Sequence, residues 1–301
     1  MTRLASLPAV TTPTPPVSGF TLVRNAIRLD FPVEASIRSI LPLCDEVVVN
    51  VGKSDDDTLD LVRGIDDPRI RIIESQWDFS GDYRVLADET QRAMTACRHP
   101  WGVYIQGDEV LHHDGVPLLR DAIASHDGNR AVEGLLLRYR HFYGTPEYLA
   151  TCRGWYPYEV RVVRLGNPWD IRSFRDAQGF RVGASDRKIR VKRTDAWMHH
   201  YGWARPDSAL VEKLKTSQSI YGGPANENVE TVRLPWQPGI RRYTGTHPET
   251  VTGWVAQRLG RFEDRVFPRE WRWRHLRDHA TALVERVTGN RPFEFRNYRV
   301  I

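Results

Sequence analysis

The sequence predicts an α/β fold, a mixed and mostly parallel sheet flanked by helices. Short apolar runs alternate with segments of helical periodicity over roughly 120 residues, as in successive βαβ units. The run at 46–50 has three consecutive valines bounded by the polar residues Glu46 and Asn50, which is typical of a parallel strand buried on both faces. With 301 residues, 41% of them hydrophobic, the chain is long enough to bury a sizeable core.

The expected elements begin with the β-rich run at 20–24. Pro32 fits the first position of a helix, and Val33, Ile37 and Ile40 then repeat at helical spacing. Further strands are expected at 46–50, 69–74, 101–105, 133–138 and 159–164. Further helices are expected at 58–63, 83–97, 116–125, 208–221, 250–265 and 271–287.

Composition divides the chain into three segments. Residues 1–18 contain an uncharged, proline-rich stretch and are expected to form a disordered tail. Residues 19–203 hold most of the alternating strands and helices and are expected to form the α/β domain. Residues 204–301 are expected to form a mainly helical C-terminal extension.

Composition also excludes several classes of protein. The mean hydropathy is −0.50, and no apolar run approaches the ~18 residues of a membrane helix, so an integral membrane protein is excluded. The 31 aromatic residues exclude a fully disordered chain. Three cysteines without a CxxC pair argue against a disulfide scaffold and favour the cytoplasm.

The C-terminal helices are rich in arginine and include Trp254, Trp271 and Trp273. A basic, aromatic face of this kind fits peripheral contact with an anionic membrane, and core tryptophans under a solvated basic face are the alternative. The net charge of +5 also suits nucleic acid, but no segment resembles a nucleic-acid-binding module, so we expect no such partner. The sequence carries no prediction of oligomeric state.

A first polar loop follows the expected strand at 46–50. It begins at Asn50 and contains Gly52, which permits a tight turn, and three consecutive aspartates at 55–57. Helix capping explains one aspartate, but three mutually repelling carboxylates fit a partner rich in donors, such as a ribose or a base. A solvated acidic loop is the alternative.

A second polar loop, YIQGDEVLHHD, spans 104–114 and contains Gln106, Asp108 and Glu109. Carboxylates at the carboxyl end of a strand can hold a divalent ion against a diphosphate, and hard oxygen ligands favour Mg²⁺ or Mn²⁺. His112 and His113 are adjacent and are therefore expected to point in different directions, which argues against a zinc site. A plain acidic loop is the alternative.

Three segments in this order resemble family 2 glycosyltransferases, which have the GT-A fold. They are VRNAIRLD at 23–30, DEVVVNVGKSDDDT at 45–58 and WGVYIQGDEVLHHD at 101–114. The resemblance spans about a third of the chain and implies a Rossmann-like nucleotide-diphospho-sugar transferase domain at 19–203. It implies that the donor is bound by Arg24, Asn25, Asn50, Gly52, Asp55, Asp56, Gln106 and Asp108.

The chain departs from the family pattern at several positions. Ala26 stands where the family has an acidic residue, and Asn50 where it usually has Asp. Gln106 replaces the first Asp of the D-x-D metal motif, which lowers the charge of the site by one and weakens metal binding. Mg²⁺ or Mn²⁺ is the implied cofactor, and basic side chains in place of a metal are the alternative.

The downstream half is similar to lipopolysaccharide-core-type members of the same family. This similarity implies a catalytic base in the loop at 173–179, where Asp176 is the candidate, and Glu159 and Asp186 are rivals. It also implies that His200, with His199 as the second choice, completes a metal site with Asp108. Lys213 and Lys215 lie on the next expected helix.

Residues and resemblance together predict a glycosyltransferase. It moves a sugar from a nucleoside diphosphate-sugar to a hydroxyl of a glycan, lipid-linked or small-molecule acceptor, with inversion implied by the resemblance. Cell-surface glycan or glycoconjugate synthesis in the cytoplasm or at the inner membrane face is the expected setting. A nucleotide-sugar-binding module without turnover and a sugar nucleotidyltransferase stay open as alternatives, the latter disfavoured because 24–28 has no glycine.

Overall fold

A computed structural model describes residues 14–80, 84–175, 179–220, 229–259, 267–269, 272–288, 291–292 and 294–301. Its strands are β1 (Val17–Val23), β2 (Glu46–Gly52), β3 (Ile70–Ser75), β4 (Trp101–Tyr104), β5 (Glu109–Leu111), β6 (Gly134–Tyr143), β7 (Thr145–Ala150), β8 (Tyr158–Arg164), β9 (Ile171–Phe174), β10 (Gly179–Val182), β11 (Arg187–Trp203), β12 (Ile240–Arg242) and β13 (Tyr298–Val300). Its helices are α1 (Val33–Ile40), α2 (Thr58–Arg63), α3 (Val85–Thr95), α4 (Gly115–His126), α5 (Asp207–Ile220), α6 (Thr252–Ala256) and α7 (Trp273–Thr288), with a 3-10 turn η1 (Glu249–Val251).

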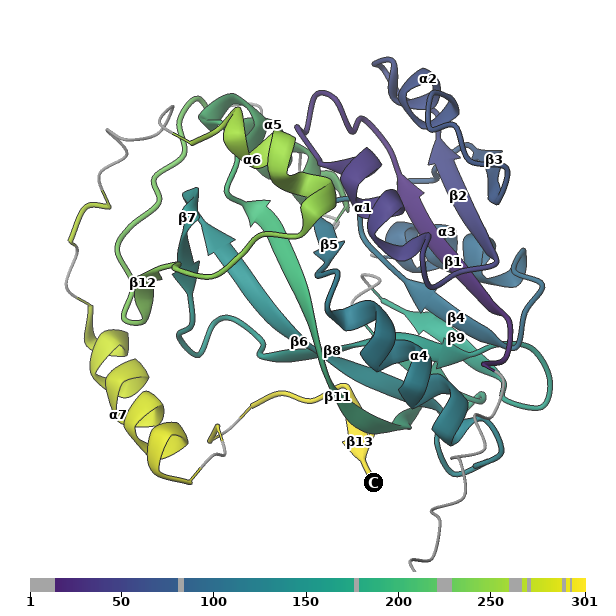
Figure 1. The fold of residues 1–301 in the computed structure, drawn as a ribbon. Helices are drawn as coiled ribbons and strands as arrows, with labels where there is room; N and C mark the ends of the chain where they lie inside the picture. Colours follow the sequence, from purple (N-terminus) through teal and green to yellow (C-terminus); the bar gives the residue numbers. More distant parts are fainter. Residues whose placement is uncertain are drawn as a thin grey trace, which may run out of the picture.

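The described strands form one mixed sheet in the order β3-β2-β1-β4-β8-β6-β11-β10-β9 (Figure 1). The four strands β3, β2, β1 and β4 are parallel, and β8 joins β4 in the antiparallel direction. Strand β1 thus has β2 on one side and β4 on the other, so the direction in which successive strands are added to the sheet reverses at β1. This reversal is the kind of switch point at which α/β sheets bind ligands beyond the carboxyl ends of their strands.

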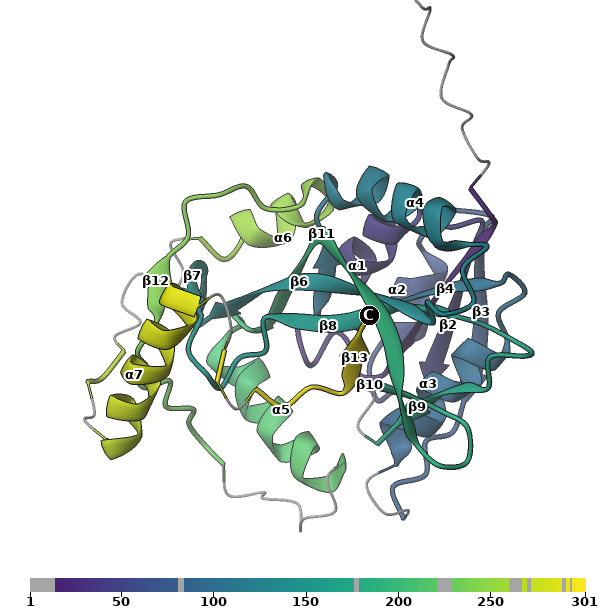
Figure 2. The same cartoon turned by 90° about the horizontal axis from the view of Figure 1, so that it is seen from below.

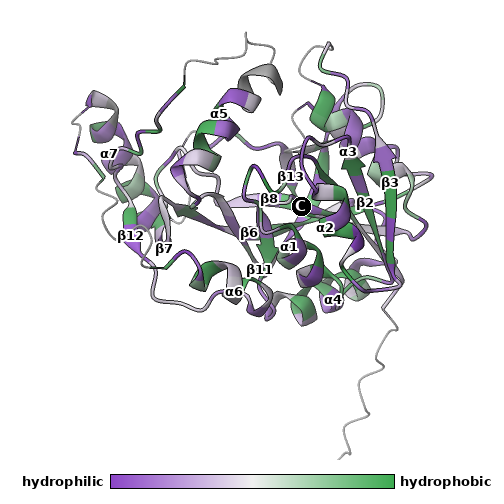
Figure 3. Ribbon diagram, turned by 90° about the horizontal axis from the view of Figure 1, so that it is seen from above, coloured by the Kyte–Doolittle hydropathy of each residue, from purple (hydrophilic) through white to green (hydrophobic). Residues whose placement is uncertain are grey.

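Helices cover both faces of the sheet, as the sequence predicts. Helices α1 and α4 lie on one face and α3 on the other (Figure 2). Ile37 of α1 and Leu119 of α4 belong to one hydrophobic core, and Met94 of α3 belongs to the core of the opposite face. Figure 3 shows strongly hydrophobic residues along β2 and β3. Strand β2 is buried throughout, as expected of a strand covered on both faces, whereas the edge strand β3 is only partly buried. The predicted α/β class is confirmed.

The N-terminal boundary differs from the prediction. Strand β1 begins at Val17, so Val17 and Ser18 belong to the sheet and not to the tail predicted for 1–18. The backbone N–H of Val17 donates to Asp45 at 2.8 Å, and the Ser18 hydroxyl donates to Glu46 at 2.7 Å. Both carboxylates lie at the start of β2, far along the chain from Val17 and Ser18. The sequence of the tail therefore did not predict these hydrogen bonds. Residues 1–13 lie outside the described residues.

The C-terminal segment contains the predicted helices as α5, α6 and α7, but it also contributes strands to the sheet. β12 pairs with β7, and β13 pairs with β11. The helix predicted at 250–265 is described only as η1 and α6, which ends at Ala256, and 260–266 lie outside the described residues. None of the helices within the described ranges has both the length and the apolarity needed to cross a bilayer.

Candidate functional site

The loop after β1 is held by side chains of the loop after β2. Asn25 has φ 51°, a left-handed conformation that Asn tolerates better than most residues. Its side chain accepts from the backbone N–H of Asp55 at 2.8 Å and donates to the Asp55 carboxylate at 3.1 Å. Arg24 donates to the Lys53 carbonyl at 2.9 Å. The two predicted loops thus form one unit at the edge of the sheet.

Asp56 also works within this unit. Its carboxylate accepts the backbone N–H groups of Ile27 and Arg28 at 3.1 and 2.9 Å, and that of Thr58 at 3.1 Å. These bonds satisfy donors in the turn after β1, where regular structure supplies no partner. Asp55 and Asp56 therefore stabilise the loops, and their predicted contact to a donor stays a prediction.

Asn50 is fully buried and bound on both sides of its amide. Its Nδ2 donates to Glu89 Oε2 at 2.7 Å, and its Oδ1 accepts from Ser75 at 2.9 Å. Gly52 is required by the indole of Trp77, because a Cβ built on Gly52 would lie 2.2 Å from Trp77 Nε1. The predicted contacts of Asn50 and Gly52 to a donor stay predictions, and neither residue lines the cavity described below.

We expect Gly52→Ala to destabilise the protein and displace Trp77. The added methyl overlaps a ring that is buried and has little room to move, which costs about 1–3 kcal/mol in a packed interior. Urea unfolding measures the loss. Gly128→Ala is the matched control, because its added methyl meets no atom within 4 Å. Equal stability of the two variants would contradict the packing of Trp77 on Gly52.

The loop after β4 rests on a buried ion pair. Arg161 of β8 binds Glu109 through Nη2 to Oε1 at 2.7 Å and Nε to Oε2 at 2.9 Å, and both side chains have 0% exposure. The Tyr139 hydroxyl donates to Glu109 at 2.8 Å, and the backbone N–H of Gln106 donates to it at 3.1 Å. Glu109 is therefore a structural anchor for the residues before it, and it is not free to bind a ligand.

Asp108 is surrounded by positive or proton-donating groups. Its Oδ2 lies 3.5 Å from Nε2 of His200 and 3.8 Å from Nζ of Lys213. Gly202 permits this packing, since a Cβ there would lie 2.6 Å from both Asp108 Oδ2 and His200 Nε2. Burial alone would raise the pKa of Asp108, but His200, Lys213 and Arg205 together hold it well below its usual range. Asp108 is thus a carboxylate at neutral pH.

A chain of hydrogen bonds orients His200. Nε2 of His141 lies 2.7 Å from the Tyr156 carbonyl, which can only accept, so we assign the His141 proton to Nε2. Burial first of all lowers the pKa of His141 well below its usual value, and the neutral ring then accepts at Nδ1 from His200 Nδ1, 3.0 Å away. His200 Nε2 is thereby directed at Asp108. Sequence reasoning missed His141, which lies in β6 without a motif of its own.

Lys213 of α5 presents its amine to the same place. It donates to the Gly202 carbonyl at 3.0 Å, and its side chain is about a quarter exposed. Burial is the largest influence on its pKa, and together with the charge of Arg205 it lowers the pKa to about 8 against the opposing effect of Asp108. The site thus holds an ammonium ion whose charge is easily lost above neutral pH.

A cavity of about 960 Å³ opens where these groups meet, at the carboxyl ends of β1 and β4. Its volume is at the upper end of the range for ligand pockets. Its polar lining includes the predicted residues Arg24, Asn25, Gln106, Asp108 and His200, together with Lys213. Its aromatic lining comprises Phe31, Trp77, Tyr104, Trp155, Tyr156 and Trp203. Of the predicted donor residues, Asn50, Gly52, Asp55 and Asp56 are not part of this lining, and their contact to a donor stays a prediction.

A divalent ion fits the side chains around Asp108 poorly. Asp108 and His200, the predicted ligands, do approach each other, but the Lys213 ammonium lies beside the same oxygen. Arg205 is a second buried cation that acts on Asp108, and Gln106 contributes no charge. A dication here would meet two positive side chains and one carboxylate, so its binding is electrostatically disfavoured. The predicted metal site stays a prediction that these charges oppose.

The predicted catalytic base, Asp176, lies outside the described residues. Its rivals are engaged elsewhere. Asp186 pairs with Arg172 at 2.6 Å on the surface, and the Glu159 carboxylate accepts its neighbour's backbone N–H at 2.9 Å. Neither rival lines the cavity. The base therefore stays a sequence prediction.

The expected membrane-facing tryptophans differ in their surroundings. Trp254 is half-buried and packs under Arg258, whereas Trp273 on α7 is 83% exposed, and Trp271 lies outside the described residues. Leu283 and Val287 on α7 are exposed as well. Membrane contact stays a prediction.

Comparisons with known proteins give a limited structural likeness. No protein-family model matches the sequence, and no curated protein matches it. Solved structures that match include S. aureus TarS 1-349 at 17% identity and TM-score 0.35, over 44% of this chain and 38% of that one. The same TarS segment in complex with UDP-GlcNAc matches at 18% identity and TM-score 0.35, over 43% of this chain and 36% of that one. The chain thus spans less than half the length of these structures.

Proposed function

We propose that the protein is a glycosyltransferase that uses a nucleoside diphosphate-sugar and transfers the sugar to an acceptor hydroxyl. The observation that carries this proposal is the cavity at the switch point of the sheet, where the Asn25 loop meets the cluster of Asp108 and Lys213. The three sequence segments that resemble family 2 glycosyltransferases end at this cavity or support its lining. Its size suits a nucleotide-sugar with part of an acceptor.

In this proposal, fixed cations replace a resident metal ion. Lys213 and Arg24 line the cavity and offer donors to the diphosphate, whose negative charge grows as the glycosidic bond breaks. Asp108 holds Lys213 in place and offsets its charge in the free protein. The aromatic lining, with Trp155 and Trp203 in edge-to-face contact, offers a surface for a sugar ring. Holding donor and acceptor in line then supplies much of the rate.

We also propose the acceptor class, the stereochemistry and the cellular setting of the reaction. The acceptor is a glycan, a lipid-linked molecule or a small molecule, and transfer proceeds with inversion through a base for which Asp176 is the sequence candidate. The setting is cell-surface glycan or glycoconjugate synthesis on the cytoplasmic side. A binding module without turnover is the competing function, favoured by the neutral Gln106 in place of an acidic ligand.

Thermal shift tests the donor site. We expect one of UDP, GDP, dTDP or CMP, or its sugar, to raise the melting temperature in the presence of EDTA. A ligand at about 100 times its Kd adds about 2.7 kcal/mol to the free energy of unfolding. A shift that requires Mn²⁺ or Mg²⁺ would contradict the replacement of the metal, and no shift with any nucleotide would contradict the donor site itself.

A turnover assay distinguishes a glycosyltransferase from a nucleotide-sugar-binding module. With the nucleotide-sugar that gives the shift, we expect slow release of the nucleoside diphosphate by hydrolysis and faster release with a suitable acceptor. Binding without hydrolysis, and without transfer across an acceptor panel, would favour the module.

A further inference from the structure

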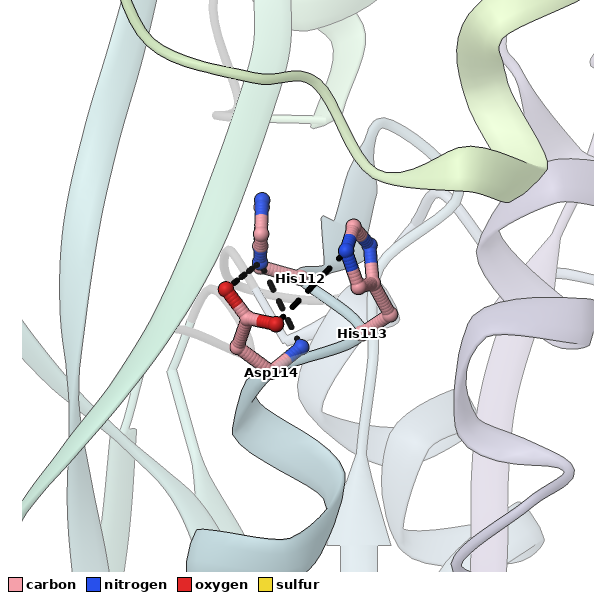
Figure 4. Close-up of side chains that lie close together, drawn as sticks. All are labelled: His112, His113 and Asp114. Atoms are coloured by element: carbon pink, nitrogen blue, oxygen red, sulfur yellow. Dashed lines mark hydrogen bonds and ion pairs between the residues drawn. The ribbon is translucent and has the colours of Figure 1, made fainter.

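A second group of ionisable side chains lies outside the cavity, at the start of α4. His112, His113 and Asp114 follow β5 directly, and their potential ligand atoms all lie within 4.8 Å of one another (Figure 4). Adjacent histidines were expected to point in different directions. Here the turn into α4 instead stacks the two rings, with centroids 4.2 Å apart and planes at 26°.

A fourth side chain reaches the group from a distant part of the chain. The Glu249 carboxylate, at the first residue of η1, lies 3.9 Å from Nε2 of His113. Asp114 and Glu249 are 77% and 80% exposed, so solvent ions can reach this group freely. We propose that the tripeptide 112–114 and Glu249 together form a binding site for a divalent cation of the zinc class.

With one ligand atom from each of residues 112–114, these atoms lie within 4.8 Å of one another, so small side-chain rotations bring them to the spacing of a tetrahedral ion. Metal–ligand bonds of ~2.1 Å in a tetrahedral site place neighbouring ligand atoms about 3.4 Å apart. Nδ1 of His112 lies 3.3 Å from Asp114 Oδ2, and Nε2 of His113 lies 3.6 Å from Asp114 Oδ1. The Glu249 oxygen is a few tenths of an ångström further out, within the reach of an exposed side chain. Two imidazoles with two carboxylates form a ligand set that suits Zn²⁺.

The hydrogen bonds of His112 fix its tautomer and turn Nδ1 toward the group. Its Nδ1 faces the backbone N–H of Asp114 at 3.4 Å, which can only donate, so the ring proton belongs on Nε2. That Nε2 lies 3.1 Å from the Thr246 hydroxyl, which accepts the proton and fixes the ring, as outer partners of metal-bound histidines do. The lone pair of Nδ1 faces the Asp114 N–H at a long 3.4 Å, and the Asp114 carboxylate lies 3.3 Å away. A cation bound here would take the place of this weak contact.

The charges of the group point the same way. Within the described part of the chain, neither Asp114 nor Glu249 forms an ion pair with Lys or Arg, although the protein carries 43 such residues. Their ion-pair partners in that part are the imidazoles of His112 and His113 alone. Acting as metal ligands, the two carboxylates and two imidazoles together carry a charge of −2, which a dication cancels.

The proposed ion would link two parts of the chain that lie far apart in sequence. β5 pairs with β11, where Glu109 lies opposite His200, so the 112–114 turn continues the segment that carries Asp108. Glu249 and Thr246 belong to the segment before α6. A shared ion would hold this segment against the back of the loop that lines the cavity, without entering the cavity.

Zinc titration of the full chain tests the site independently of the proposed function. After treatment with EDTA and removal of the chelator, we expect one equivalent of Zn²⁺ to bind by calorimetry and to raise the melting temperature. Co²⁺ in place of Zn²⁺ should give the intense visible absorption of a tetrahedral site. We expect His113→Ala with Asp114→Asn to weaken binding at least tenfold, and Glu249→Gln to weaken it less.

Two control variants decide between sites. Asp121→Asn removes an exposed carboxylate from the same helix and should leave binding unchanged. His200→Gln removes a ligand of the metal site predicted from the sequence at Asp108, and this variant should still bind one equivalent of Zn²⁺. The proposal would be overturned if the His113/Asp114 variant still bound one equivalent of Zn²⁺, or if His200→Gln lost it. Absence of any stoichiometric binding by the unaltered protein would overturn it as well.

Discussion

Replacing Lys213 by Met should weaken binding of the nucleoside diphosphate by about 10- to 100-fold, since a charge-assisted hydrogen bond contributes about 1.5–3 kcal/mol. The Lys213 ammonium lines the cavity and lies 3.8 Å from Asp108. In the proposed function, it takes the place of the positive charge of a metal ion. Methionine keeps the packing volume but removes the charge. Calorimetry in EDTA, with the nucleotide identified by thermal shift, measures the change in Kd.

The pH dependence of binding gives the same prediction a second readout. The pKa of Lys213 is about 8, so its charge is present below pH 8 and is lost as the pH rises through that value. Affinity of the unaltered protein should therefore fall between pH 7 and 9, and the Lys213→Met variant should show a flatter profile. Lys215→Met on the same helix is the matched control, because Lys215 does not line the cavity. Equal losses in the two variants, or an unchanged profile, would sink the assignment.

Breaking the ion pair between Glu109 and Arg161 should cause the largest loss of stability. Both side chains are completely buried, and removal of one partner leaves a charge without compensation, which costs about 3–5 kcal/mol. Urea unfolding of Glu109→Gln and of Arg161→Met measures each loss. The double variant should lose clearly less than the sum of the two, because it leaves neither charge unpaired.

A surface pair provides the comparison for this experiment. Asp88 and Arg84 on the N-terminal side of α3 are 56% and 65% exposed, so Asp88→Asn should change stability by no more than about 0.5 kcal/mol. Losses below about 1 kcal/mol in the buried variants would show that Glu109 does not anchor the loop. Because Glu109 also accepts the Gln106 backbone N–H, we expect the buried variants to loosen the cavity lining.

The sequence predicted the strands and loops around the site well, because these depend on local sequence patterns. The apolar runs at 20–24, 46–50 and 101–105 are confirmed as β1, β2 and β4 within one or a few residues. Parallel strands bring their carboxyl ends to one edge, so the loops after them were expected to meet. The structure brings Asn25, Gln106 and Asp108 to one cavity at that edge.

The roles of individual polar residues were harder to predict. Asp55 and Asp56 looked suited to a ligand, but they hold the turn after β1 through backbone hydrogen bonds. Asn50 was expected to bind the donor. In the structure, Glu89 and Ser75 occupy both sides of its amide, and its contact to a donor stays a prediction. The same carboxylate or amide can hold a loop in place or bind a ligand. Only the distances to its partners in the folded protein distinguish the two roles.

The sequence by itself therefore determined the α/β class, the order of the central elements and the loops that form the site. Hydrophobic periodicity and turn residues act over a few positions, and a single chain displays them directly. Only the tertiary structure decided which charges meet. Asp108 with Lys213, Glu109 with Arg161, and His113 with Glu249 are separated by about 50 to 140 residues, and their contact depends on the pairing and crossing of strands and helices. Electrostatic interaction depends on distance in space, which the order of residues along the chain does not reveal.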